Sequence, residues 1–251
     1  MLNKKSRARV GWAVGLGLAL GVVAVVPLQA TSSSVPWPEL SYPPKSEVSW
    51  VAQDVTVNGL PMRILDIKSD LGAAEVLAYY KTLWSGTHNG AAQMQDIGAW
   101  RAVSSMQGAF NIVVQVKPLA EGAGSEGRIS VANTLEARAD YFPPSWPQFM
   151  ELKTLQFMES VDGPRRSYHF TGAAHKTLDG TVGHVKDAFK RKGWQVQQEQ
   201  RVEMPGGTRG MLVTMTTPGQ DRSLDVAAYQ PALNEPVALT LNLVQPSKDR
   251  R

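Results

Sequence analysis

A unit of one turn, one strand and one helix occurs twice in this chain of 251 residues, and this repeat restricts the fold more than any other feature. The first copy covers residues 58–86 and the second covers residues 162–194. Each begins with a dipeptide, Asn58-Gly59 or Asp162-Gly163, that tolerates the positive φ angles of a tight hairpin turn. Two related folded units, each with a β-hairpin, are therefore expected.

Each copy also predicts an amphipathic helix at the same distance from its turn. At 100° per residue, the apolar side chains of each helix fall within one narrow arc. In the first copy these are Ala73, Leu77, Tyr80 and Trp84, and 105 positions later they are Leu178, Val182, Val185 and Phe189. These faces are expected to cover a sheet.

Further strands are expected after each helix. In the first copy a polar loop over 88–98 is followed by a β region from Trp100, in which residues 109–117 and 128–133 pair. In the second copy residues 210–217 and 223–229 pair, and we match them to 112–117 and 128–132. Residues 237–244 form one more strand without a clear counterpart.

These patterns predict an α+β fold of two tandem hairpin-helix-hairpin units, each an antiparallel sheet with one helix on a face. An N-terminal membrane or signal segment precedes the units. The expected segments are 1–30, signal or membrane anchor; 31–48, Ser/Pro-rich linker; 49–140, first α+β unit; 141–151, Pro-rich linker; 152–246, second α+β unit; and 247–251, basic tail.

The N-terminal segment predicts export. Four lysines and arginines lie within the first nine residues, and the run 11–28 that follows is apolar. Its length is near that of a membrane span and exceeds the ~7–15 residues of a usual signal core. Basic residues before it predict a cytoplasmic N-terminus and an exported remainder. Cleavage after Ala30 would release the protein into the periplasm, and retention of 11–28 would hold it in the inner membrane; the sequence leaves both open.

The net charge of +4 belongs to this leader and not to the folded units. The other 22 basic residues equal the 22 acidic residues in number. A nucleic-acid-binding protein needs a basic surface on its folded part, because its affinity comes from releasing counterions from phosphates. The sequence therefore predicts no nucleic-acid partner.

Motifs for catalysis or cofactors are not found. The chain has no cysteine, which excludes thiol chemistry and disulfides. Residues 122–127 fit the pattern G-x-G-x-x-G, but a predicted strand follows where the dinucleotide motif requires a helix. No H-E-x-x-H pattern and no G-x-S-x-G pattern occurs. Asp66, Asp70 and Glu75 cluster near the first helix, where helix capping explains Asp70 and Glu75. We predict no catalytic residue, no cofactor and no metal ligand.

Two groups of residues remain as candidates for binding. The first is a basic patch that would bind an anionic partner; it contains Arg165, Arg166, Lys186, Lys190, Arg191 and Lys192. The second is a set of aromatic residues in the Pro-rich segments, which would either clamp onto the folded units or dock on a partner; it contains Trp37, Tyr42, Trp146 and Phe149.

These observations favour an exported bacterial envelope protein that acts as a non-enzymatic interaction or assembly module. Its expected partners are other envelope proteins, bound at an open sheet edge, and the inner membrane if 11–28 is retained. The alternatives are a periplasmic protein that binds a small ligand or cell-wall glycan in a groove between the two units, and a hydrolase with a dispersed site.

Overall fold

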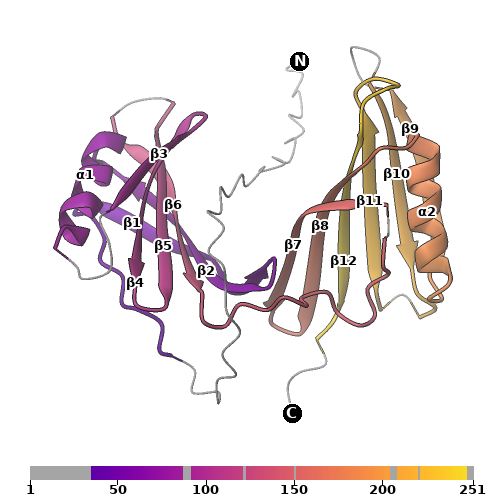
Figure 1. The fold of residues 1–251 in the computed structure, drawn as a ribbon, viewed down its shortest axis with the longest axis horizontal. Coiled ribbons are helices and arrows are strands. Elements are labelled where there is room, and N and C mark those ends of the chain that lie inside the picture. The colour runs from indigo at the N-terminus through magenta and orange to yellow at the C-terminus, as the bar shows by residue number, and fades with distance from the viewer. Residues whose placement is uncertain are drawn as a thin grey trace, which may run out of the picture.

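In the part of the chain that the structure describes, a single antiparallel sheet of 12 strands forms the body of the protein, and two helices cover one of its faces (Figure 1). The structure is a computed structural model that describes residues 35–86, 92–120, 123–149, 151–203, 208–219 and 221–247. The predicted N-terminal segment 1–30 and the tail residues 248–251 lie outside the described residues.

The chain builds two halves with the same order of elements: two strands, a helix and four strands. The first half contains β1 (Ser46–Val57), β2 (Leu60–Ser69), α1 (Ala73–Trp84), β3 (Gln93–Ile97), β4 (Trp100–Gln107), β5 (Phe110–Pro118) and β6 (Ser125–Asn133). The second contains β7 (Lys153–Asp162), β8 (Arg165–Ala174), α2 (Leu178–Lys190), β9 (Gln195–Glu203), β10 (Arg209–Thr216), β11 (Ser223–Gln230) and β12 (Val237–Pro246).

Across the sheet, the equivalent strands of the second half follow in the reverse order of those in the first. Across the sheet the order is β3-β4-β5-β6-β2-β1-β7-β8-β12-β11-β10-β9. The halves meet where β1 pairs with β7 over three residue pairs, Val55 with Ser160, Thr56 with Glu159 and Val57 with Met158. Residues that pair across strands share a face, so both helices lie on the same side of the sheet. In Figure 1 they flank its two ends, on its outer side.

The predicted α+β fold class was wrong, because the described part of the chain is mostly one antiparallel sheet with only two helices. The two units do not form separate sheets, because the β1–β7 pairing joins them into one. Four strands, and not one hairpin, follow each helix. The extra strand β3 lies in the segment 88–98 that we expected to be a loop, and its side chains are mostly exposed. An edge strand with two solvated faces shows no apolar alternation, which is the signal that sequence reasoning uses.

The matching of strands between the halves was also wrong. The pairing of 210–217 with 223–229 is confirmed, since they contain β10 and β11. However, β10 and β11 occupy the places of β4 and β5, and β12 occupies the place of β6. The strand over 237–244 therefore has a counterpart, which lies 112 residues earlier and not 105. The loops after the second helix account for the difference.

Both predicted helix faces are confirmed. Each of the eight residues named for them is buried. The face of α1 packs on β4, β5 and β6, in one apolar cluster with Ile112 and Val114. The face of α2 packs on β10 and β11, in another with Val213 and Val226. Burying a large apolar side chain contributes about 1.5–3 kcal/mol, so these faces hold each helix on the sheet.

The two Pro-rich segments are part of these cores. Trp37 lies 5.3 Å from the ring of Phe110 and stacks under the guanidinium of Arg63. Trp146 is 6% exposed and packs among the rings of the second core. The motif around each tryptophan recurs at a spacing of 109 residues, as Trp37-Pro-Glu-Leu and Trp146-Pro-Gln-Phe. We call residues 35–45, and residues 141–149 with 151–152, the straps, since each runs over the helix-bearing face of its own half.

A membrane-spanning helix was predicted, but none is found in the part of the chain that the structure describes. Within it, α1 and α2 are both too short and too polar to cross a bilayer. The apolar run 11–28 that motivated the prediction lies outside the described residues.

A buried hydroxyl in the first core gives a test of this packing. Tyr80 is 3% exposed, and its Oη has no hydrogen-bond partner among the described residues. Burial raises the pKa of Tyr80 well above 10.0, with smaller contributions from Tyr79 and Tyr42. The folded state then keeps a proton that the unfolded state loses above pH 10, so stability falls as the pH rises through that range.

We expect Tyr80→Phe to be as stable as the parent near pH 7, or more stable by about 1 kcal/mol, because an unsatisfied buried hydroxyl is removed. Above pH 10 the variant should lose less stability than the parent. Urea unfolding at pH 7 and at several values above pH 10 measures both effects. Tyr79→Phe, at the half-buried neighbour, is the control. An equal loss of stability above pH 10 in the parent and in Tyr80→Phe would show that Tyr80 is not the group that titrates.

Candidate functional site

The face of the sheet opposite the helices, which we call the helix-free face, carries three cavities in the part of the chain that the structure describes. Its residues alternate with those of the cores: Asp66 and Lys68 lie on it, whereas Leu65 and Ile67 pack under α1. Cavities of about 720, 370 and 240 Å³ open on this face. Neither helix and neither strap covers them. These cavities therefore lie on the side of the sheet that neither the helices nor the straps cover.

The cavity of about 720 Å³ lies in the first half, over a row of alternating charges. Lys117 on β5 pairs with Glu126 on β6, Glu126 pairs with Lys68 on β2, and Lys68 pairs with Glu47 on β1. Side chains in such cross-strand positions are neighbours on one face. We call these four residues the charged row. Trp100 on β4 extends it, with the Lys117 ammonium 4.8 Å from the centre of the indole ring.

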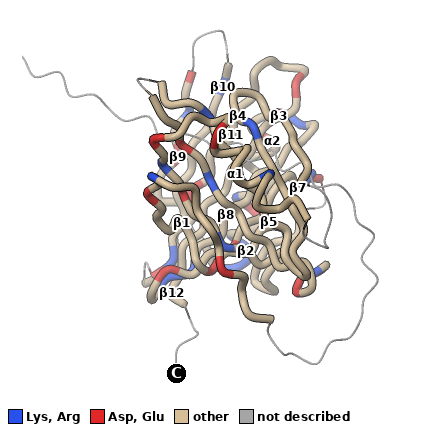
Figure 2. The backbone as a smooth tube through the Cα atoms, turned by 90° about the vertical axis from the view of Figure 1, so that its left-hand side faces the viewer, with Lys and Arg blue, Asp and Glu red and all other residues tan. Residues whose placement is uncertain are grey.

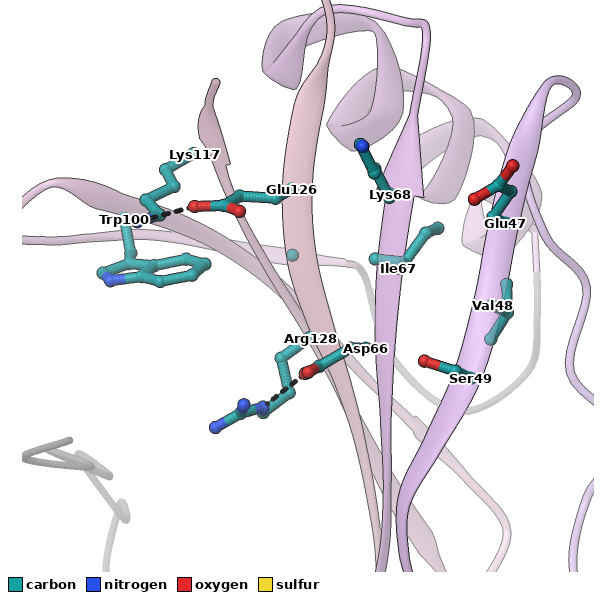
Figure 3. A pocket seen from close by; sticks show the side chains of 11 residues that line it. Glu47, Val48, Ser49, Asp66, Ile67, Lys68, Trp100, Lys117, Glu126 and Arg128 are labelled. Carbon is teal, nitrogen blue, oxygen red and sulfur yellow. Dashed lines mark hydrogen bonds and ion pairs between the residues drawn. The ribbon is translucent and has the colours of Figure 1, made fainter. Parts of the chain in front are cut away.

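Two ion pairs order the side chains around this cavity (Figure 3). Lys117 Nζ lies 2.8 Å from Glu126 Oε1, and Arg128 Nε donates to Asp66 Oδ1 at 2.9 Å. Both carboxylates are about half exposed, so each pair contributes at most about 1 kcal/mol to stability. Their effect is on orientation, since each holds one oxygen and one nitrogen at the cavity wall.

The charges around this cavity balance. Three carboxylates and three cationic groups line it, so its formal charge is zero. It offers hydrogen-bond donors from the lysines and arginine, acceptors from the carboxylates, and one aromatic wall. Such a site suits a polar ligand without net charge. Over the rest of the described chain both signs are also interspersed (Figure 2).

The second half does not repeat the charged row. Its matching positions are Tyr229 on β11, Ala238 on β12, Ala173 on β8 and Lys153 on β7. Near the β1–β7 junction the first half is the apolar one and the second half is the polar one. The first half has a buried apolar cluster with Met62 and Ile64, where the second half has Ser167 and His169 105 residues later. The charged cavity is therefore a property of one half.

His169 takes part in a hydrogen-bonded chain that resembles a nucleophile with its base. Its Nδ1 lies 2.6 Å from Asn242 Oδ1, and its Nε2 lies 3.4 Å from Thr171 Oγ1. A hydroxyl, an imidazole and an amide in this order can support acyl transfer if backbone donors stabilise the oxyanion. β8 lies between β7 and β12, so its backbone N–H groups are engaged in the sheet. We assign no catalytic role to this group.

The predicted basic patch is divided by the fold. Lys186, Lys190, Arg191 and Lys192 belong to α2 or follow it, and α2 packs on β10 and β11. The two arginines begin β8, on the other side of β12. Arg166 donates to Glu159 at 2.7 Å, and Lys186 donates to Glu199 at 2.6 Å. The structure therefore gives two smaller basic groups, each partly compensated by a carboxylate.

The predicted aromatic residues lie on the straps. Trp146 and Phe149 pack in the second core, and Trp37 packs in the first. Tyr42 is the most exposed of the four, at 39%. Burial raises the pKa of the Tyr42 phenol. Three of the four side chains are thus held against the sheet of their own half.

The other motifs have structural roles. Glu75 accepts a hydrogen bond from Gly72 N at 2.8 Å and caps α1. Asp66 pairs with Arg128 and lies apart from this cap. Ser125, inside the G-x-G-x-x-G pattern, begins strand β6. In the described part of the chain, no group of three or more histidine, aspartate or glutamate residues is placed to hold a metal ion.

Sequence reasoning missed the charged row. Lys68, Lys117 and Glu126 are single charges in strands where apolar and polar residues alternate, and this alternation is typical of a sheet with one solvated face. Their alignment depends on the register of β5, β6, β2 and β1, which bring together residues up to 79 positions apart. Comparisons of the chain with protein-family models, with curated proteins and with solved structures found no match.

Proposed function

We propose that the protein is an exported, non-catalytic binding protein of the bacterial envelope, and that the helix-free face is its binding surface. One observation carries this proposal: helices and straps cover one face of a 12-stranded sheet, whereas the other holds the three cavities. Concave surfaces with a few fixed polar groups are the usual sites of ligand binding. The basic and apolar leader at 1–30 supports export.

The open edges of the sheet give less support to binding by strand addition. The edge strand β9 carries Glu199, Arg201 and Glu203, and its pairing with β10 contains a register shift. Lys186 and Asp179 of α2 bind Glu199 and Arg201. The opposite edge, β3, has only five residues. Charges, bulges and short strands are features that prevent edge-to-edge pairing. The face is therefore the better candidate.

Export can be tested with a phosphatase reporter that folds only outside the cytoplasm. We expect residues 1–48 fused to this reporter to give active enzyme, and residues 31–48 alone to give none. Cell fractionation of the full chain should place it in the envelope or periplasm. An inactive fusion with a stable, cytoplasmic product would contradict the localisation.

The binding face can be tested by hydroxyl-radical footprinting of the full chain with and without solubilised envelope material. We expect protection of Trp100, His169 and Tyr229, which lie on the helix-free face. Trp50 and Leu83 are exposed away from it and should react as before. Protection that is confined to these two controls, or no protection of the three face residues, would contradict the proposal.

A further inference from the structure

We propose that the cavity over the charged row binds a neutral oligosaccharide, an inference that rests on the proposed binding function and specifies its ligand. The cavity of about 720 Å³ falls within the range of ligand sites, roughly 300–1,000 Å³. Its contents decide which class of ligand fits: two ion pairs, one tryptophan and no formal net charge.

The alternation of charge disfavours ligands of a single sign. Along the row the side chains are Lys117, Glu126, Lys68 and Glu47, so a polyanion or a polycation would meet repulsion at every second position. A hydroxyl group both donates and accepts hydrogen bonds, so it can pair with either kind of side chain. A chain of neutral sugars presents such groups at each unit and carries no charge.

The dimensions favour an elongated ligand. From Trp100 on β4 to Glu47 on β1 the site crosses five adjacent strands. Neighbouring strands are about 4.8 Å apart, so the site extends for roughly 19 Å. This is longer than one sugar ring or one amino acid. An oligosaccharide that lies across the strands would contact the whole row.

The second ion pair and the tryptophan supply the remaining contacts. Arg128 and Asp66 lie two residues along their strands from Glu126 and Lys68, on the same face. Held against each other at 2.9 Å, they present a planar guanidinium and a carboxylate that are already oriented. Side chains that are ordered before binding lose less conformational entropy when the ligand arrives. The indole of Trp100 offers an apolar surface for the C–H face of a sugar ring, and it is fixed next to Lys117.

The test is isothermal titration calorimetry on the full chain with chitotetraose, the β-linked tetramer of N-acetylglucosamine. We expect saturable binding, weakened at least tenfold by Trp100→Ala and by Glu126→Gln. Tyr229→Ala, at the matching site of the second half, should bind as the parent does. The deacetylated cationic tetramer and anionic tetragalacturonate should bind at least tenfold more weakly than chitotetraose. Circular dichroism and thermal unfolding confirm that each variant is folded.

Three results would overturn the inference. The first is the absence of saturable binding up to millimolar concentrations. The second is tighter binding of either charged tetramer. The third is a dimer, detected by sedimentation, that dissociates in Trp100→Ala and in Glu126→Gln. This result would assign the charged row to self-association. If chitotetraose fails while the footprint on the helix-free face persists, the saccharide inference fails and the proposed function stands.

Discussion

Replacing Trp146 with alanine is expected to destabilise the protein by about 3–5 kcal/mol, the usual cost of removing a large aromatic side chain from a core. Its ring lies 5.0 Å from that of Phe157 and 5.9 Å from that of Phe189 on α2. This side chain of the strap thus contacts both the helix and the sheet. Urea unfolding of the purified chain measures the change.

Two variants show whether the effect comes from the strap. Trp50→Ala, at a tryptophan that is 47% exposed, should change stability by much less. Trp146→Phe should lie between this control and alanine, because it keeps an aromatic ring and removes a buried Nε1–H that has no partner among the described residues. If Trp146→Ala were no more harmful than Trp50→Ala, the strap would not be part of the core.

The straps show that the proline content of a segment does not decide whether its side chains pack in the core. Proline and serine favour extended chain without ladder hydrogen bonds, and they predicted linkers whose aromatic residues either clamp onto the folded units or dock on a partner. The structure places a tryptophan from each segment against the apolar face of its own half. That burial depends on the tertiary contacts of Trp37 and Trp146. The recurrence of Trp-Pro at a spacing of 109 residues was the available signal.

Local features were predictable because their determinants are close in sequence. The helix faces at Leu77 and Val182 follow from a period of 3.6 residues, and the turn at Asn58 follows from a dipeptide. The joining of the halves was not predictable in this way. It depends on pairs such as Val55 with Ser160, which are 105 residues apart and carry no local signal. The charged row has the same origin, since it exists only once four strands are in register.

The same reasoning explains the difference between the halves. A fold used twice needs its apolar helix faces and its turns in both copies, and these recur. The helix-free face has no such requirement. There the first half carries Lys68 and Glu126, whereas the second carries Ala173 and Ala238 at the matching positions. Binding of the neutral oligosaccharide is therefore expected in the first half only, where the charged row lies.

The turn between β1 and β2 is the other point at which one substitution should have a large effect. Asn58 and Gly59 have φ angles of 48° and 81°, as a tight hairpin turn of this kind requires. Asn58 N donates to Phe157 O at 2.7 Å, and Phe157 N donates to Asn58 Oδ1 at 2.7 Å. Arg138 N donates to Gly59 O at 2.9 Å. The turn thus fastens the first half to β7 and to the chain that leads into the second strap.

Gly59→Ala is expected to destabilise the protein by about 2–5 kcal/mol. A residue with a side chain costs roughly 1–2 kcal/mol at this positive φ. A Cβ at Gly59 would also collide with the backbone carbonyl oxygen of Arg138 and lie 3.1 Å from the ring of Tyr141. Overpacking of this kind costs typically 1–3 kcal/mol more, because a backbone atom cannot rotate away.

Gly108→Ala is the matched control for this prediction. Gly108 has a φ of 58° in the turn between β4 and β5, and a Cβ there would meet nothing within 4 Å. This variant should show only the conformational cost, about 1–2 kcal/mol. The excess in Gly59→Ala then measures the close contact between the turn and the chain leaving the first half. Equal losses in the two variants would mean that this contact does not fix the halves, and that the β1–β7 pairing alone holds them in one sheet.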